Sequence, residues 1–119
     1  MFNNKENRLE DEWTIGGNDF PLEFELEMDD GRLVALRGST ITWTLSYIGQ
    51  KDSPILVKSS TNGGITITGV NTCKIHLTGE DTIHLDSCKY EHELTIVQAD
   101  GRVLRPSYGY IEIRQGSVY

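Results

Sequence analysis

Two segments of this chain alternate apolar and polar side chains with a period of two residues. In residues 22–28, Leu, Phe, Leu and Met alternate with Glu, and in residues 40–47, Ile, Trp, Leu and Tyr alternate with Thr and Ser. Successive side chains of a β-strand point to opposite faces of its sheet, so each segment has one apolar and one polar face. The alternation therefore predicts antiparallel strands with one face packed and one face in water.

Turn signals divide the rest of the chain into further short strands. Asp30-Gly31 and Asp100-Gly101 are typical of hairpin turns, and Pro21 favours an edge position because proline has no amide donor. We expect strands at about 20–28, 40–48, 55–58, 65–68, 72–77, 89–98, 103–105 and 110–114, with 33–36 a short strand or an extended link. About seven short strands in some 100 residues predict a two-sheet sandwich, with a closed barrel as the alternative.

One segment departs from the strand pattern. Thr78 and Asp81 have the spacing of a capping box, in which each side chain accepts from the backbone amide of the other. This predicts one short helical turn between two strands. Ile83 and Leu85, which follow it, are expected to enter the core.

Length and charge limit the domain organisation and the partners. The chain has 119 residues, enough for one domain, and a net charge of −7. Residues 1–16 are acidic and have few apolar anchors, so we expect a flexible N-terminal arm followed by one domain over residues 17–119. An acidic chain repels phosphate, which argues against binding nucleic acid. No run of 18 apolar residues and no secretory signal are present, so we expect no membrane span and synthesis in the cytoplasm.

The sequence predicts no catalytic residue, no cofactor and no metal site. Five potential soft-metal ligands lie within twenty residues, but they lack the spacing of a zinc site, and we expect His92 to face the core with one hydrogen-bond partner. Glu91 and Glu93 are expected on the wet face of their strand as solvated charges. Cys73 and Cys88 are expected as free thiols in a reducing compartment.

The order of the motifs resembles that of a known family. These motifs are Gly17-Asn18-Asp19 with the strand Phe20–Leu26, Asp30-Gly31, Gly38–Thr42, Gly63–Ile67, Leu77-Thr78, Glu80-Asp81-Thr82, Lys89-Tyr90 and Asp100-Gly101-Arg102. Over residues 17–114 this order resembles small phage and prophage tail proteins, in particular the N-terminal domain of phage baseplate upper proteins. The chain differs from that pattern at Cys88, where the family has glycine, and at His92, where it has an aromatic residue.

The resemblance implies both a fold and a role. The fold is an all-β, immunoglobulin-like antiparallel β-sandwich. The role is that of a non-enzymatic structural component of a phage or prophage tail or baseplate, located in the virion. Its partners would be other tail or baseplate proteins, and it would form homo-oligomers. A receptor- or glycan-binding module of a phage tail is the alternative function.

A group of aromatic and basic residues is the candidate interface. Tyrosine and arginine are enriched among the residues that dominate binding energy at protein interfaces. The candidate residues, mostly near the C-terminal end, are Trp13, Arg105, Tyr108, Tyr110, Arg114 and Tyr119. The same aromatic residues could instead be ordinary half-buried side chains of a sheet, or a surface that stacks on sugars.

Overall fold

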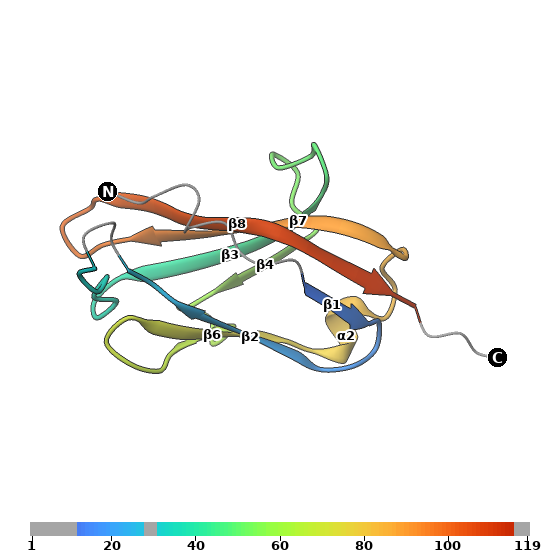
Figure 1. The fold of residues 1–119 in the computed structure, drawn as a ribbon, viewed down its shortest axis with the longest axis horizontal. Coiled ribbons are helices and arrows are strands. Elements are labelled where there is room, and N and C mark those ends of the chain that lie inside the picture. The colour runs from blue at the N-terminus through green and yellow to red at the C-terminus, as the bar shows by residue number, and fades with distance from the viewer. Residues whose placement is uncertain (1–11, 28–30, 116–119) are drawn as a thin grey trace.

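The chain folds into two β-sheets packed face to face (Figure 1). The computed structural model describes residues 12–27 and 31–115, except for the side chains of residues 12, 13 and 106–108. The five-stranded sheet has the order β1-β8-β7-β3-β4, and the three-stranded sheet has the order β2-β6-β5. The strands are β1 (Glu12–Ile15), β2 (Phe20–Glu25), β3 (Thr40–Tyr47), β4 (Leu56–Ser59), β5 (Ile65–Ile67), β6 (Thr72–Leu77), β7 (Cys88–Val97) and β8 (Val103–Arg114).

This strand order is that of an immunoglobulin-like sandwich. Strands β2, β6 and β5 form one layer, and β8, β7, β3 and β4 form the other, as in the variable type of that fold. All neighbouring strands are antiparallel except β1, which pairs in parallel with β8. The predicted fold class is therefore confirmed, and the two separate sheets exclude the closed barrel.

The alternating segments supply the core, as the period of two predicts. On β3, Ile41, Trp43 and Leu45 are buried, while Thr42 and Thr44 on the opposite face are only partly covered. The other strands contribute in the same way, and the shared interior includes Leu22, Phe24, Ile75, Leu77, Tyr90, Leu94, Ile96, Ile111 and Ile113. Burial of this apolar area is the main stabilising contribution to the fold.

Ring contacts of His92 at the centre of the sandwich reach β3 in its own sheet and β2 in the other sheet. The imidazole of His92 on β7 lies between Trp43 and Phe24, with ring centroids 6.0 Å and 6.3 Å away. Trp43 donates its indole Nε1–H to His92 Nδ1 over 3.0 Å, so His92 is held as the neutral tautomer that carries its proton on Nε2. In antibody domains a disulfide crosses between the sheets beside a buried tryptophan. Here an imidazole and a phenyl ring bridge the two layers instead.

A tyrosine corner fixes the start of β7. Tyr90 lies two residues before His92, and its hydroxyl donates to the backbone carbonyl of Asp86 over 2.7 Å. The phenol ring is fully buried. Burial has the largest effect in raising the pKa of the Tyr90 hydroxyl, and nearby Cys88 and Tyr47 raise it further. Since the phenol stays protonated, it keeps the donor that closes this corner.

The expected helical turn is present between β6 and β7. Helix α2 (Gly79–Thr82) has the predicted capping box, in which Thr78 accepts from the Asp81 amide and Asp81 accepts from the Thr78 amide. Lys58 on β4 adds an ion pair of 2.7 Å to Asp81. The helix is therefore tied to the edge of the opposite sheet.

The link between β1 and β2 packs directly on this helix. Thr82 is fully buried and its hydroxyl accepts the Gly17 amide over 3.0 Å, while Asp19 accepts the Gly79 amide over 2.8 Å. A Cβ at Gly79 would collide with the carbonyl oxygen of Gly17. The expectation that Ile83 enters the core is wrong, because Ile83 is 51% exposed and Thr82 takes the inward position.

The structure differs from the sequence-based expectations at both ends. Residues 12–15, assigned to the arm, form β1 and pair with residues 111–114 of β8. Residues 103–105 and 110–114 belong to one continuous strand of 12 residues, and a register shift between Leu94 and Ile96 of β7 accommodates the segment around Pro106. The described residues therefore form eight strands rather than about seven, and the predicted arm over residues 1–11 lies outside them.

Cys73 and Cys88 are both free thiols, as expected. Cys73 is fully buried opposite Phe24 in the β2–β6 pair, and burial raises its pKa to about 11. At neutral pH this thiol is therefore protonated and behaves as a small apolar side chain.

Replacing Trp43 by Phe should reduce the free energy of unfolding by about 2–3 kcal/mol, because His92 Nδ1 loses its donor inside the core and the smaller ring leaves a gap. Urea denaturation followed by circular dichroism measures the change. Thr42→Val, on the opposite face of the same strand, is the matched control and should change stability by less than about 0.5 kcal/mol. Equal stability of the two variants would show that the Trp43–His92 contact does not stabilise the sandwich.

Asp81→Asn should cost about 1 kcal/mol at neutral pH, because it removes the ion pair with Lys58 and weakens the cap. Burial alone would raise the pKa of Asp81, but the hydrogen bonds from Lys58 and Thr78 and the charge of Lys58 outweigh it and lower the pKa below 3.8. The stabilisation is present above that value and is lost as the pH falls through the lowered pKa.

The difference in unfolding free energy between wild type and Asp81→Asn should therefore shrink in acid. Urea titrations at pH 7 and at pH values below 3.8 measure it. Glu80→Gln, which alters an exposed carboxylate in the same turn, serves as the control. A difference that stays constant across this range would contradict the role given to the Asp81 carboxylate.

Candidate functional site

The outward face of the five-stranded sheet carries a row of polar side chains across three strands. Ser46 of β3 lies opposite Glu91 of β7, which in turn lies opposite Tyr110 of β8. Thr44 and Glu93 form the next row. These residues are outward because their neighbours along each strand fill the core.

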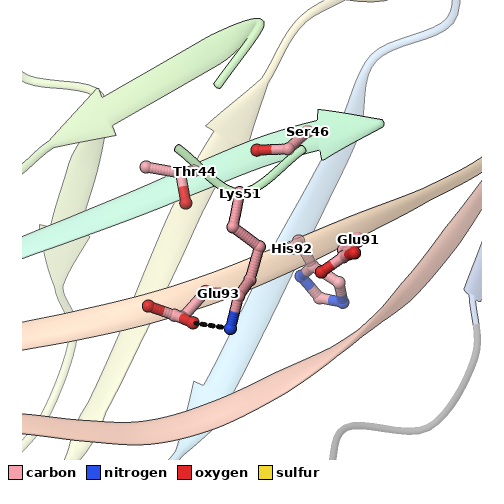
Figure 2. A pocket seen from close by; sticks show the side chains of 6 residues that line it. All are labelled: Thr44, Ser46, Lys51, Glu91, His92 and Glu93. Carbon is pink, nitrogen blue, oxygen red and sulfur yellow. Dashed lines mark ion pairs between the residues drawn. The ribbon is translucent and has the colours of Figure 1, made fainter. Parts of the chain in front are cut away.

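The connection between β3 and β4 folds back over these rows and stands out from the sheet in Figure 1. Glu91 Oε1 accepts the backbone amide of Gly49 over 2.5 Å, and Lys51 Nζ lies 3.8 Å from Glu93 Oε2. Figure 2 shows the Lys51 side chain reaching down to Glu93. Two carboxylates of β7 thus hold this connection against the sheet.

A cavity of about 190 Å³ lies between this connection and the sheet. Its lining residues are Thr44, Ser46, Lys51, Glu91, His92 and Glu93 (Figure 2). Ser46 is only 3% exposed, and its hydroxyl makes no hydrogen bond among the described residues. The cavity is therefore lined by hydroxyls, carboxylates, one ammonium group and the imidazole of His92.

Charges around the cavity balance. Glu93 is half-buried and lies between two exposed cations, Lys51 at 3.8 Å and Arg105 at 3.7 Å. Together with Glu91, these groups carry two negative and two positive charges. At such distances and exposures each ion pair contributes little stability, so both cations can move away at small cost.

The predicted interface residues with described side chains are spread along β8. Arg105 and Arg114 lie near opposite ends of β8, roughly 30 Å apart at the rise of a strand. Tyr110 is half-buried between them on the outward face, and Arg114 pairs with Glu112 over 3.0 Å. Of the predicted group, Arg105 lies beside the cavity through Glu93, and Tyr110 lies beside it through Glu91.

The other three predicted residues have no described side chain. Trp13 lies in β1, with its backbone opposite Glu112 of β8. Tyr108 lies in β8 opposite Glu93 of β7. Tyr119 lies outside the described residues. Their part in an interface stays a prediction.

The described part of the chain offers little for catalysis. No group of three or more His, Cys, Asp or Glu side chains there could hold a metal ion. Thr66 Oγ1 and His76 Nε2 lie 2.7 Å apart on the exposed side of the three-stranded sheet, but no described carboxylate orients the other ring nitrogen of His76. His92 has the expected core position, with Trp43 as a hydrogen-bond partner.

The sequence missed the residues of the cavity. Thr44, Ser46, Glu91 and Glu93 occupy the polar-face positions that the alternation predicts, and for Glu91 and Glu93 that position indicates solvated charges rather than a site. These residues are covered only because the β3–β4 connection folds back over them. No sequence pattern marks Lys51, which lies in that connection. The fit of that connection onto the sheet is a tertiary contact that no local pattern encodes.

Comparisons with known proteins assign no family to the chain. No protein-family model matches the chain, and no curated protein matches it. Among solved structures, a structure of murine CRIg is similar, with 18% sequence identity, a TM-score of 0.41, and coverage of 92% of this chain and 94% of that one. No helix in the described part of this chain is long and apolar enough to cross a membrane.

Glu91→Ala should loosen the β3–β4 connection, because the Gly49 amide loses its acceptor. An exposed hydrogen bond to a carboxylate contributes on the order of 1 kcal/mol, so exchange of the Gly49 amide hydrogen should accelerate about fivefold. Hydrogen exchange followed by NMR measures this rate. Thr95→Ala, on the same strand and face, should leave the rate unchanged, and equal rates in both variants would contradict the anchoring role of Glu91.

Proposed function

We propose that this domain is a non-enzymatic assembly module of a phage or prophage tail or baseplate. It binds neighbouring tail proteins and further copies of itself. The motif order over residues 17–114 supports the tail assignment, and the immunoglobulin-like sandwich is the fold which that resemblance implies.

The open edge at β4 is the observation that carries the binding role. β4 ends the five-stranded sheet, and no described strand pairs with its outer side. Val57 on this edge is 52% exposed. The backbone groups of an unpaired edge can accept a strand from another chain, which is a common mode of protein association.

A hollow beside this edge gives room for side chains of the added strand. It has a volume of about 370 Å³ and lies between β4 and the three-stranded sheet, where it is lined by Val57, Lys58, Asn62, Gly63, Gly64, His76 and Thr78. An apolar side chain on the edge and a hollow next to it together favour an extended segment as the bound element.

Val57→Lys should weaken association through this edge, because a charged side chain at an edge opposes the addition of another strand. We expect the apparent self-association constant to fall at least about tenfold, as measured by sedimentation equilibrium. Val103→Lys is the matched control, since Val103 is 50% exposed at the start of β8 and away from β4. A wild-type chain that stays monomeric at high concentration, and binds none of the tail proteins encoded beside it, would overturn the proposal.

A further inference from the structure

A small polar cavity roofed by a folded-back connection is a feature that assembly through the β4 edge does not use. The cavity under the β3–β4 connection has walls from two adjacent strands and from Lys51. Gly49 is hydrogen-bonded to Glu91, so the roof has a fixed position over the sheet. We propose that this cavity binds one ring of a neutral saccharide.

The hydroxyl of Ser46 is a group that a polar ligand could bind. Ser46 is only 3% exposed, its side chain lines the cavity, and its hydroxyl makes no hydrogen bond among the described residues. The neighbouring Thr44 also makes no side-chain hydrogen bond among them, and both side chains line the cavity. A ligand with its own hydroxyls would satisfy these two groups.

The mixture of groups favours hydroxyls over charges on the ligand. Glu91 and Glu93 accept hydrogen bonds, Lys51 donates them, and the two serine and threonine hydroxyls do both. Because the charges of Glu91, Glu93, Lys51 and Arg105 cancel, neither a cation nor an anion gains a net attraction. A charged ligand would have to separate an existing ion pair, whereas a neutral diol can bond to the groups of both signs at once.

Size and the neighbouring aromatic residue agree with a single sugar ring. A cavity of about 190 Å³ is of the size of one six-membered ring. Tyr110 lies opposite Glu91, a lining residue, in the β7–β8 register and on the same outward face. An aromatic ring beside hydrogen-bonding groups offers an apolar surface for the C–H face of a sugar.

The weak ion pairs provide the route of entry. Lys51 is 66% exposed and pairs with Glu93 only at 3.8 Å, so its side chain can swing out without a large cost. After entry, Lys51 can donate to a ligand hydroxyl in place of this long contact. The site therefore needs no rearrangement of the sheet.

The test is a titration of the full chain, followed by ¹H–¹⁵N NMR. The probes are glucose, galactose, mannose, rhamnose, N-acetylglucosamine and N-acetylgalactosamine, with n-butylammonium and acetate as charged probes. At least one sugar should give saturable shifts at the amides of Ser46, Gly49 and Glu93, with a dissociation constant on the order of 1 mM because one ring makes few contacts. Methyl glycosides of the best sugar distinguish a unit within a longer chain from a free reducing sugar.

Two variants locate the binding. Ser46→Ala should weaken it at least about fivefold, because the ligand loses the buried hydroxyl, and it should not harm the fold, because Ser46 makes no hydrogen bond there. Thr42→Ala, on the same strand and face but outside the cavity, should bind like the wild type. Saturable shifts with none of the six sugars, shifts with a charged probe alone, or binding that Ser46→Ala leaves unchanged would each overturn the proposal.

This inference is independent of the tail assignment. Val57→Lys at the β4 edge tests assembly, and Ser46→Ala in the cavity tests the sugar site. Loss of one property in its own variant, with the other property retained, separates the two.

Discussion

The contact between Trp43, His92 and Phe24 joins the two sheets at the centre of the sandwich. His92 accepts a hydrogen bond from the indole of Trp43 in its own sheet and packs against Phe24 of the other sheet. Because Nδ1 is the acceptor of this bond, the imidazole in this arrangement is neutral. The fold therefore uses aromatic packing and one hydrogen bond where extracellular relatives of this architecture use a covalent link, and its stability does not depend on an oxidising environment.

The sheets held in this way present two different surfaces. At the margin, β4 leaves its outer backbone groups without a partner strand among the described residues, which suits the addition of a strand. On the outward face, the β3–β4 connection folds back and makes a small polar cavity with Glu91 and Glu93. The β3–β4 connection thus links the cavity to the edge. Strand β3 borders both surfaces, and its opposite face carries Trp43.

Local patterns predicted most strands and the capped turn, and failed where distant segments meet. The period of two in residues 40–47 and the Thr78–Asp81 spacing each depend on neighbouring residues, so both were predictable. Strand β1 was not, because the alternation in Glu12–Ile15 is only four residues long and its burial is reversed: Thr14 is buried and Ile15 is exposed where the strand pairs with β8. The prediction for Ile83 was wrong for the same reason. The β1–β2 link packs on α2, and Thr82 rather than Ile83 is the buried residue there. The cavity depends on a connection folding over a sheet, which no periodicity records.

The parallel pairing of β1 with β8 determines how the domain bears a mechanical load. When the chain is pulled from both ends, the force draws β1 and β8 along each other in opposite directions, so the ladder from Glu12↔Ile111 to Ile15↔Arg114 is loaded in shear. Bonds loaded in shear share the force and break together, whereas a hairpin pulled open yields one bond at a time. The four residues of β1 therefore resist extension of the domain when it is pulled from both ends.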